Sequence, residues 1–393
     1  MSVAGSYDFV SYKVESPVFV GNSSFNESVK FINETTGFVG NNEGIFKTND
    51  GGVTWSKVYN SSKSVKCISF INSTVGWAVG NQGLVVKTID GGNNWTLAAS
   101  ITTPYALYKV LFKDSNNGLI VGDFGSIFTT SNGGNTWVAT STFNIALYPT
   151  FTSVAFAPNT SNIWAVGSQH PNGFIAKSSD NGLNWSQASV PVFNNKGFGI
   201  PAKLNDIVFT TSNNGWVVAD DGLYRTTDGG ITWQTQSTGV VGLLAAIQFV
   251  NTQVGFIVGN NNTTLLKTVD SGNTWKSLNT FAYANSLSFI SEKLGWMTYN
   301  STVVKYTAPQ CSTTPAVLVS NCCNGLESQK SGSWSDPTTW SCNRVPTATD
   351  DVFINAGHTV TENSSPIIRA KTLTYRGGML HIPQTTTLRL GNQ

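Results

Sequence analysis

The sequence predicts an all-β fold, a seven-bladed β-propeller followed by a small β-rich, β-helix-like segment. Three observations support the propeller: a short motif that occurs six times, a strand pattern that occurs seven times, and a spare strand before the first repeat. Repeats of about 40 residues built from short strands and Gly turns are typical of radial arrays of small sheets.

The repeated motif, called the box here, begins with Thr or Ser, continues with Asp or Asn and Gly, and ends with Trp. The box Trp residues recur 40 to 48 positions apart, at Trp55, Trp95, Trp137, Trp185, Trp233 and Trp275. The acidic or amide position of each box is Asp50, Asp90, Asn132, Asp180, Asp228 and Asp270. The glycines allow positive φ in a tight turn, the carboxylate accepts hydrogen bonds from its own turn, and the Trp ring packs between sheets. We therefore interpret these residues as structural, not as catalytic acids or calcium ligands.

The second strand of each repeat reads Gly, an apolar or aromatic residue, and small apolar residues. It occurs at 37–40, 76–80, 118–122, 164–167, 215–218, 255–259 and 295–297. The last unit, 286–307, has three strands and no box, whereas 7–14 is an alternating strand before the first unit. Pairing that strand with the last sheet would close the ring and remove two open edges, so we predict 7–14 as the outer strand of the seventh blade.

The predicted domains are a propeller at 1–308, a Cys-containing linker at 309–330 and the start of a β-helix-like domain at 331–393. Charged residues make up 11% of the 393 residues and the formal net charge is +2. The chain has no Lys/Arg block that would suit nucleic acid and no apolar stretch long enough to span a membrane. It also lacks a basic and apolar leader. We expect a monomeric propeller within a longer exported chain, located outside the cell or on its surface.

Cysteine usage is uneven along the chain. Cys67 lies in an apolar run and is predicted to be a buried, unpaired core residue. The other four cluster between the repeats and the C-terminal segment, at Cys311, Cys322, Cys323 and Cys342. Because adjacent cysteines pair poorly, we expect two bridges that join Cys311 and Cys342 to the central pair, which would indicate an oxidising compartment. A zinc site is the alternative, although the spacing lacks the usual CxxC pairs.

The box resembles the Asp-box of sialidase-type propellers. The fuller unit, with Gly-Trp-Ala-Val-Gly at 76–80 and Lys-Thr-Ile-Asp-Gly-Gly at 87–92, more closely resembles the photosystem II assembly/stability factor propeller family. This resemblance spans 7–307 and implies a seven-bladed, non-enzymatic protein that holds a client protein. Such propellers carry an arginine patch thought to contact the client, but residues 1–308 contain only Arg225.

Basic residues do recur just before the boxes, where they could form a ring that binds an acidic client. The ring consists of Lys47, Lys87, Lys177, Arg225, Lys267 and Lys305. Alternatively, these are amphipathic strand residues whose charged tips are solvated.

The C-terminal part resembles the start of the eight-glycine domain found in large secreted surface proteins of Bacteroidetes. The resemblance rests on Ser-Gly-Ser-Trp-Ser-Asp-Pro-Thr-Thr-Trp at 331–340 and on the Asp-Asp-Val-Phe-Ile-Asn-Ala-Gly-His run at 350–358. The strands that follow, 367–375 and 378–382, suit the first coils of a parallel β-helix.

Few residues suggest catalysis. A sialidase needs several arginines to clamp a carboxylate, which lysine does not replace. Carboxylates that could form a glycosidase pair occur in turns between second and third strands, at Glu43, Asp123, Asp220 and Asp221. The three histidines, His170, His358 and His381, form no motif, and no metal or cofactor fingerprint is present. We predict no enzyme activity and no cofactor.

One mouth of the ring collects amide and aromatic side chains, which suit recognition of a glycan or an extended peptide. The candidate binding residues are Asn42, Gln82, Phe124, His170, Asp220, Asp221, Asn261 and Tyr299. The alternative is that Asn-Gly turns are simply favoured in short hairpins. Our main hypothesis is a non-enzymatic binding propeller whose mouth recognises a protein or glycan. The alternatives are an assembly chaperone that uses the basic ring and, third, a glycosidase.

Overall fold

The structure, a computed structural model, divides the chain into two compact units, the propeller at 12–308 and a second unit that contains the C-terminal residues. It describes residues 13–14, 18–22, 25–98, 101–140, 148–169, 172–188, 203–240, 242–259, 265–278, 284–308, 326–340, 345–347, 351–355, 357–362, 367–370, 372–376, 379–381 and 387–390. Cys311, Cys322, Cys323, Cys342, His170 and Asn261 lie outside these residues.

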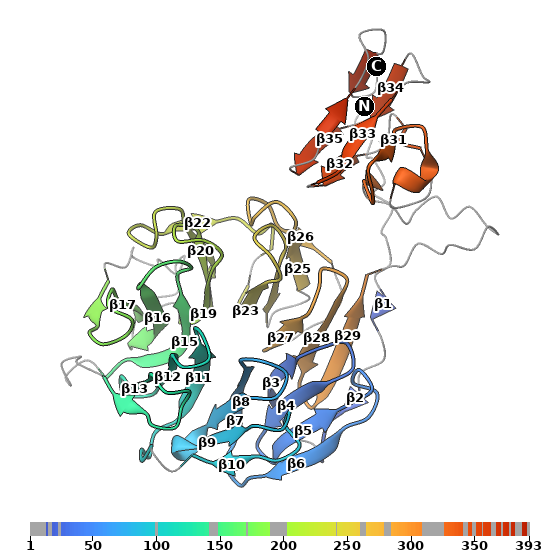
Figure 1. Cartoon of the computed structure of the whole chain (residues 1–393). Helices are drawn as coiled ribbons and strands as arrows, with labels where there is room; N and C mark the ends of the chain where they lie inside the picture. Colours follow the sequence, from blue (N-terminus) through green and yellow to red (C-terminus); the bar gives the residue numbers. More distant parts are fainter. Residues whose placement is uncertain are drawn as a thin grey trace. The chain divides into compact units, whose positions relative to one another are not determined.

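The propeller is a ring of antiparallel sheets, one for each predicted blade (Figure 1). Blade 1 contains β3 (Asn26–Phe31), β4 (Gly37–Asn41), β5 (Gly44–Thr48) and β6 (Ser56–Asn60). Blade 2 contains β7 (Val65–Phe70), β8 (Gly76–Gly80), β9 (Val85–Thr88) and β10 (Thr96–Leu97), with the 3-10 turn η1 (Asn81–Gly83) before β9. Blade 3 contains β11 (Leu107–Phe112), β12 (Gly118–Gly122), β13 (Ile127–Thr130) and β14 (Val138–Ala139).

The next blades repeat this arrangement. Blade 4 contains β15 (Thr150–Phe156), β16 (Ile163–Gln169), β17 (Asn172–Ser178) and β18 (Ser186–Gln187). Blade 5 contains β19 (Leu204–Phe209), β20 (Gly215–Ala219), β21 (Gly222–Thr226) and β22 (Gln234–Gln236). Blade 6 contains β23 (Leu244–Phe249), β24 (Gly255–Gly259), β25 (Leu265–Thr268) and β26 (Lys276–Ser277).

Blade 7 closes the ring as the sequence predicts. Its own strands are β27 (Leu287–Phe289), β28 (Leu294–Tyr299) and β29 (Thr302–Thr307). β1 (Lys13–Val14), the described part of the predicted N-terminal strand, pairs antiparallel with the outer side of β29. β2 (Val18–Phe19), which the sequence analysis did not predict, pairs with the same strand at Val303 and Thr302. The chain therefore joins its beginning to the last blade, and the seven-bladed closure is confirmed.

The core lies between blades and is built from sets of three aromatic residues. Trp77 of blade 2 is fully buried, stacks on Phe112 at 5.8 Å between ring centroids, and meets Trp137 edge-on at 5.7 Å. The same set recurs at most other junctions. Each set contains the aromatic residue of the second strand of one blade, and the Phe at the end of the inner strand and the box Trp of the following blade. Its members include Phe38, Phe70 and Trp95; Trp164, Phe209 and Trp233; and Trp216, Phe249 and Trp275.

Blade 7 has no box, and Tyr306 takes the position of the missing Trp. Tyr306 is buried and lies 6.0 Å from Phe256 and 5.4 Å from Phe289, measured between ring centroids. Blade 7 therefore makes an aromatic contact with blade 6 although it lacks the box.

The second unit consists of short parallel ladders. β30 (Leu326–Glu327), β32 (Asp351–Asn355) and β35 (Thr372–Arg376) form one, and β31 (Gly332–Ser333), β33 (Thr359–Thr361) and β36 (Met379–His381) form another. β34 (Ile367–Ala370) pairs with β37 (Thr387–Leu390), and η3 (Pro337–Thr339) precedes Trp340. Trp334 and Trp340 are buried and pack edge-on at 5.0 Å. The β-helix interpretation of this unit stays a prediction.

Candidate functional site

The boxes form turns with hydrogen bonds inside each turn. In the first box, Thr48 Oγ1 donates to Asp50 Oδ1 at 2.7 Å and accepts from the N–H of Gly52 at 3.0 Å, while Asp50 accepts from the N–H of Thr54 at 2.9 Å. Asn132 makes the equivalent bond, accepting from the N–H of Thr136 at 3.0 Å. Among the residues that the structure describes, no group of three metal-ligating side chains occurs. The geometry therefore gives the boxes a structural role.

Hydrogen bonding also holds the box carboxylates ionised. The backbone and side-chain N–H groups of Asn94 lower the pKa of Asp90 to about 2, and those of Asn184 do the same for Asp180. Burial alone would raise the pKa of Asp50, but hydrogen bonds from Thr48 and Thr54 lower it to about 2. Carboxylates with such low pKa values are poor proton donors in catalysis near neutral pH.

The six basic residues of the predicted ring lie against aromatic rings of their own blades. Lys87 Nζ is 4.7 Å from the centroid of Trp77, and Arg225 is 5.3 Å from that of Trp216. The others occupy equivalent places, Lys47 over Phe38, Lys177 over Trp164, Lys267 over Phe256 and Lys305 over Trp296.

Several of these cations also bond to the box of the next blade. Lys47 is buried and donates to Gly91 O at 2.9 Å and Asn93 Oδ1 at 2.8 Å. Lys87 donates to Gly133 O at 3.0 Å, and Arg225 to Asn273 Oδ1 at 2.7 Å. The charged ends of these three residues join neighbouring blades, and those of Lys87 and Arg225 remain partly exposed. A client-binding ring remains a prediction. The contacts with neighbouring blades do not favour it, because they already engage these charged groups.

The opposite face, called the mouth, carries the turns between second and third strands and the connections between blades. Backbone bonds hold the two together: the N–H of Gly83 donates to Tyr105 O at 2.8 Å, and that of Asp220 to Lys203 O at 3.0 Å. Asn42 and Gln82 are exposed in such turns, and Tyr299 ends β28 at the turn of blade 7. The described candidates thus lie in turns of blades 1, 2, 3, 5 and 7.

The candidate carboxylates are each engaged locally. Glu43 pairs with Lys57 at 3.0 Å, and Asp123 accepts from Thr150 Oγ1 at 2.9 Å. Asp220 accepts from Asn205 Nδ2 at 2.8 Å.

Asp221 accepts from the hydroxyl of Tyr224 at 2.6 Å, and burial raises the pKa of Asp221. Glu43, Asp123 and the two blade 5 aspartates belong to three different blades, and each is bound to a neighbour.

Aromatic side chains gather on the mouth beside blade 3. Phe124 stacks on Tyr105 at 4.3 Å and meets Tyr148 edge-on at 5.6 Å, measured between ring centroids. These side chains are 52%, 39% and 54% exposed, respectively. Phe124 and Tyr148 have positive φ, 55° and 32°, a conformation that is uncommon for bulky residues and occurs in tight turns and at functional sites. We call Tyr105, Phe124 and Tyr148 the aromatic platform.

The sequence analysis named Phe124 as a mouth residue but not Tyr105. A signal was present: Tyr105 lies two residues before the inner strand β11, and such connections share the mouth with the turn at 122–126.

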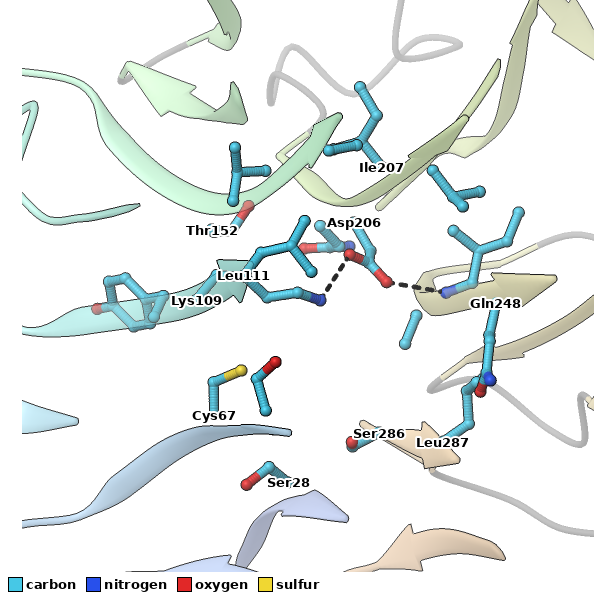
Figure 2. A pocket seen from close by; sticks show the side chains of 18 of the residues that line it. Ser28, Cys67, Lys109, Leu111, Thr152, Asp206, Ile207, Gln248, Ser286 and Leu287 are labelled. Atoms are coloured by element: carbon cyan, nitrogen blue, oxygen red, sulfur yellow. Dashed lines mark hydrogen bonds and ion pairs between the residues drawn. The ribbon is translucent and has the colours of Figure 1, made fainter. Parts of the chain in front are cut away.

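The inner strands enclose a central channel of about 470 Å³ (Figure 2). Asp206 lies at its wall and accepts from Lys109 Nζ at 3.2 Å, Ser153 Oγ at 2.5 Å and the N–H of Ile247 at 3.1 Å. Cys67 also lines the channel and is half-buried with a free thiol. The expectation of a buried, unpaired core residue is met in part: Cys67 is unpaired and packs against the core cluster around Trp77 and Val110, but it is only half-buried because β7 faces the channel.

The comparisons with known proteins agree with the geometry. The family model of the photosynthesis system II assembly factor YCF48 matches residues 14–142, 97–196 and 189–280. No curated protein matches the chain significantly in sequence. In the described part of the chain, no helix is long and apolar enough to cross a membrane.

Solved structures share the fold. A structure of YCF48 bound to D1 peptide is 18% identical, with a TM-score of 0.59, covering 77% of this chain and 99% of that one. YCF48 from Cyanidioschyzon merolae is 17% identical, with a TM-score of 0.57 and coverage of 76% and 99%. A streptogramin B lyase is 12% identical, with a TM-score of 0.61 and coverage of 77% and 99%. Because the family model covers most of the propeller, this chain belongs to the family of the photosynthesis system II assembly factor YCF48.

Proposed function

We propose that this chain is a non-enzymatic binding protein that holds an extended peptide segment of a client protein at the mouth of the propeller. The family supports a protein-binding role, and a fold relative has been solved with a bound D1 peptide. The alternative of an assembly factor is thus better supported than a glycan-binding module. The binding surface, however, differs from the basic ring that this alternative first suggested.

The observation that carries the proposal is the aromatic platform. Large, rigid aromatic side chains bury much area at low conformational entropy cost and dominate the energy of many interfaces. Stacked aromatic rings that stay exposed, with two of them at positive φ, indicate a preformed surface for apolar or aromatic side chains of a peptide. Amide groups on the same face, such as those of Asn42 and Gln82, could form hydrogen bonds with the backbone of the peptide.

A library of random 12-residue peptides displayed on phage tests the proposal with the full chain. We expect enrichment of peptides rich in aromatic or aliphatic residues. The double variant Phe124→Ala/Tyr148→Ala should bind them at least tenfold more weakly, since an aromatic hot spot contributes about 2 kcal/mol or more.

The matched control is Val138→Ala on the outer strand of blade 3, where Val138 is 61% exposed. Its binding should equal that of the parent. Failure to enrich any peptide, or equal binding by the double variant, would overturn the proposal. Binding on a glycan array that depends on Phe124 would instead favour carbohydrate recognition.

We propose separately that the chain works outside the cytoplasm. The low charge content and the four clustered cysteines support this location. Non-reducing mass spectrometry of natively produced protein should find two bridges among Cys311, Cys322, Cys323 and Cys342. Four free thiols would contradict the proposal and favour an intracellular assembly factor.

A further inference from the structure

At two junctions, side chains of one inner strand bond to the backbone of the next blade. An inner strand has an unpaired edge, and its N–H and C=O groups need partners. At the junction of blades 7 and 1, Ser286 Oγ accepts from the N–H of Val29 at 3.2 Å and Ser288 Oγ from that of Phe31 at 2.9 Å. At the junction of blades 6 and 7, Gln248 bonds to both backbone groups of Phe289, at 2.9 and 2.7 Å.

The junction of blades 1 and 2 departs from this pattern. Ser28 and Lys30 lie three residues and one residue before Phe31. Ser286 and Ser288 hold the equivalent positions before Phe289. Ser28 is only 6% exposed, yet its hydroxyl has no hydrogen-bond partner within the described part of the chain. The Lys30 ammonium likewise has no acid or hydrogen-bond acceptor among the residues that the structure describes. Both side chains line the channel.

The charges of the channel wall leave Lys30 uncompensated. Lys66 pairs with Glu27 at 2.5 Å and Lys109 with Asp206 at 3.2 Å, so both acids of the wall are taken. Burial and the charge of Lys109 lower the pKa of Lys30, partly opposed by Cys67. Lys30 is half-buried, so its charge is only partly hydrated, and an anion beside it would stabilise the folded protein.

We propose that the channel binds a small oxyanion, of carboxylate or phosphate chemistry, at the junction of blades 1 and 2. The Lys30 ammonium supplies a charge-assisted hydrogen bond and the Ser28 hydroxyl a second donor. The channel volume of about 470 Å³ accommodates such an anion. The site lies in the channel, away from the aromatic platform, and does not depend on the proposed client.

Isothermal titration of the full chain with inorganic phosphate and with acetate tests the site. Each titration is run at constant ionic strength set with sodium chloride, and thermal unfolding is measured alongside. We expect at least one anion to bind and to raise the melting temperature, because a ligand of the folded state stabilises it. Lys30→Met should lose at least tenfold in affinity, Ser28→Ala severalfold, and Lys30→Arg should retain binding.

The matched control is Lys276→Met, which removes an exposed lysine from β26 of blade 6. It should bind like the parent. Lys30→Met should also melt higher than the parent without anion and respond to neither probe, because it removes an uncompensated charge. Binding of acetate alone identifies a carboxylate site, and binding of phosphate alone a phosphate site.

Three results would overturn the proposal. One is binding of neither anion, and another is unchanged affinity in Lys30→Met and Ser28→Ala. The third is an equal rise in melting temperature with sodium chloride alone, which would show a general salt effect. If Lys30→Met does not fold, the proposal is tested by the other two variants: Ser28→Ala should weaken binding and Lys30→Arg should retain it.

Discussion

The two faces of the propeller are built on different principles. On the box face, most blades repeat one turn and one buried ring contact, and in several blades a cation also reaches the next blade. On the mouth face, the turns differ from blade to blade, and the aromatic platform occurs beside blade 3. The channel also has a feature that is not repeated, since Ser28 and Lys30 line it without the backbone contacts that Ser286 and Ser288 make at another junction.

This contrast teaches where to look for function in a repeat protein. A residue that recurs in every blade stabilises the contact that every blade makes with its neighbour. Residues of a binding site occur in one blade or a few. The basic residues before the boxes illustrate the first case, because their repetition reflects contact with the neighbouring blade. Phe124 and Lys30 illustrate the second, because each departs from its repeat.

The largest effect should come from acid, which acts on several boxes at once. The pKa of Asp50, Asp90, Asp180 and Asp228 is about 2 in the folded protein, against an ordinary 3.8. These carboxylates stabilise the fold above about pH 4, and that stability is lost as pH falls from about 4 to about 2. Denaturant unfolding followed between pH 5 and pH 2 should show a steep loss.

A variant with all four aspartates changed to Asn is the control. Asn132 shows that an amide makes the same turn, with Oδ1 accepting from Thr136 N–H at 3.0 Å and Nδ2 donating to Thr136 Oγ1 at 2.8 Å. The variant should fold and show a flatter pH dependence. An unchanged acid profile would mean that other groups govern acid unfolding.

The second largest effect should come from a buried Trp. Trp164 is 1% exposed and contacts Phe209, Trp233 and Lys177. Trp164→Ala should lower the free energy of unfolding by about 3–5 kcal/mol, measured in urea. Leu183→Ala, at a position 62% exposed, should change it by less than about 0.5 kcal/mol. Similar values for the two variants would contradict the role of the inter-blade aromatic sets.

The architecture could be predicted from the sequence because its determinants are local and repeated. Gly, Asp and Trp of one box lie within eight residues, and the closure followed from counting strands. The hydrogen bonds that line the channel could not be predicted. Ser153 and Asp206, for example, are 53 positions apart, and their contact depends on the twist of two blades. Tyr306 was missed because it fills the Trp position without any box around it.

An intermediate effect should come from the second glycine of a box. A Cβ at Gly92 would lie 2.2 Å from the ring of Phe38, whereas at Gly91 the nearest atom is Ser73 O at 3.2 Å. Both glycines have positive φ, 74° and 70°. Gly91→Ala should cost about 1–2 kcal/mol from the backbone alone. Gly92→Ala should cost about 1–3 kcal/mol more from overpacking. Equal costs in urea unfolding would show that the box glycine does not set blade spacing.

A smaller effect should come from the cation between blades. Lys87→Met removes hydrogen bonds to blade 3 and the contact with Trp77 but keeps an apolar stem. We expect a loss of about 1 kcal/mol in unfolding free energy. Affinity for the selected peptides should stay unchanged even when Lys47, Lys177 and Lys267 are replaced as well. Abolished binding at low salt, with the fold intact, would restore the basic ring as the client site.

The smallest effect on stability should come from the platform itself. Phe124→Gly removes strain at φ 55° and also removes stacking on Tyr105, so the two changes offset each other. The free energy of unfolding should stay within about 0.5 kcal/mol of the parent. Peptide affinity should nevertheless fall at least tenfold. Asn159→Gly, at φ 59° in the exposed turn between β15 and β16, is the control and should leave affinity unchanged. A large loss of stability in Phe124→Gly would assign the platform to the fold, and would remove the difference between the two faces on which the proposed function depends.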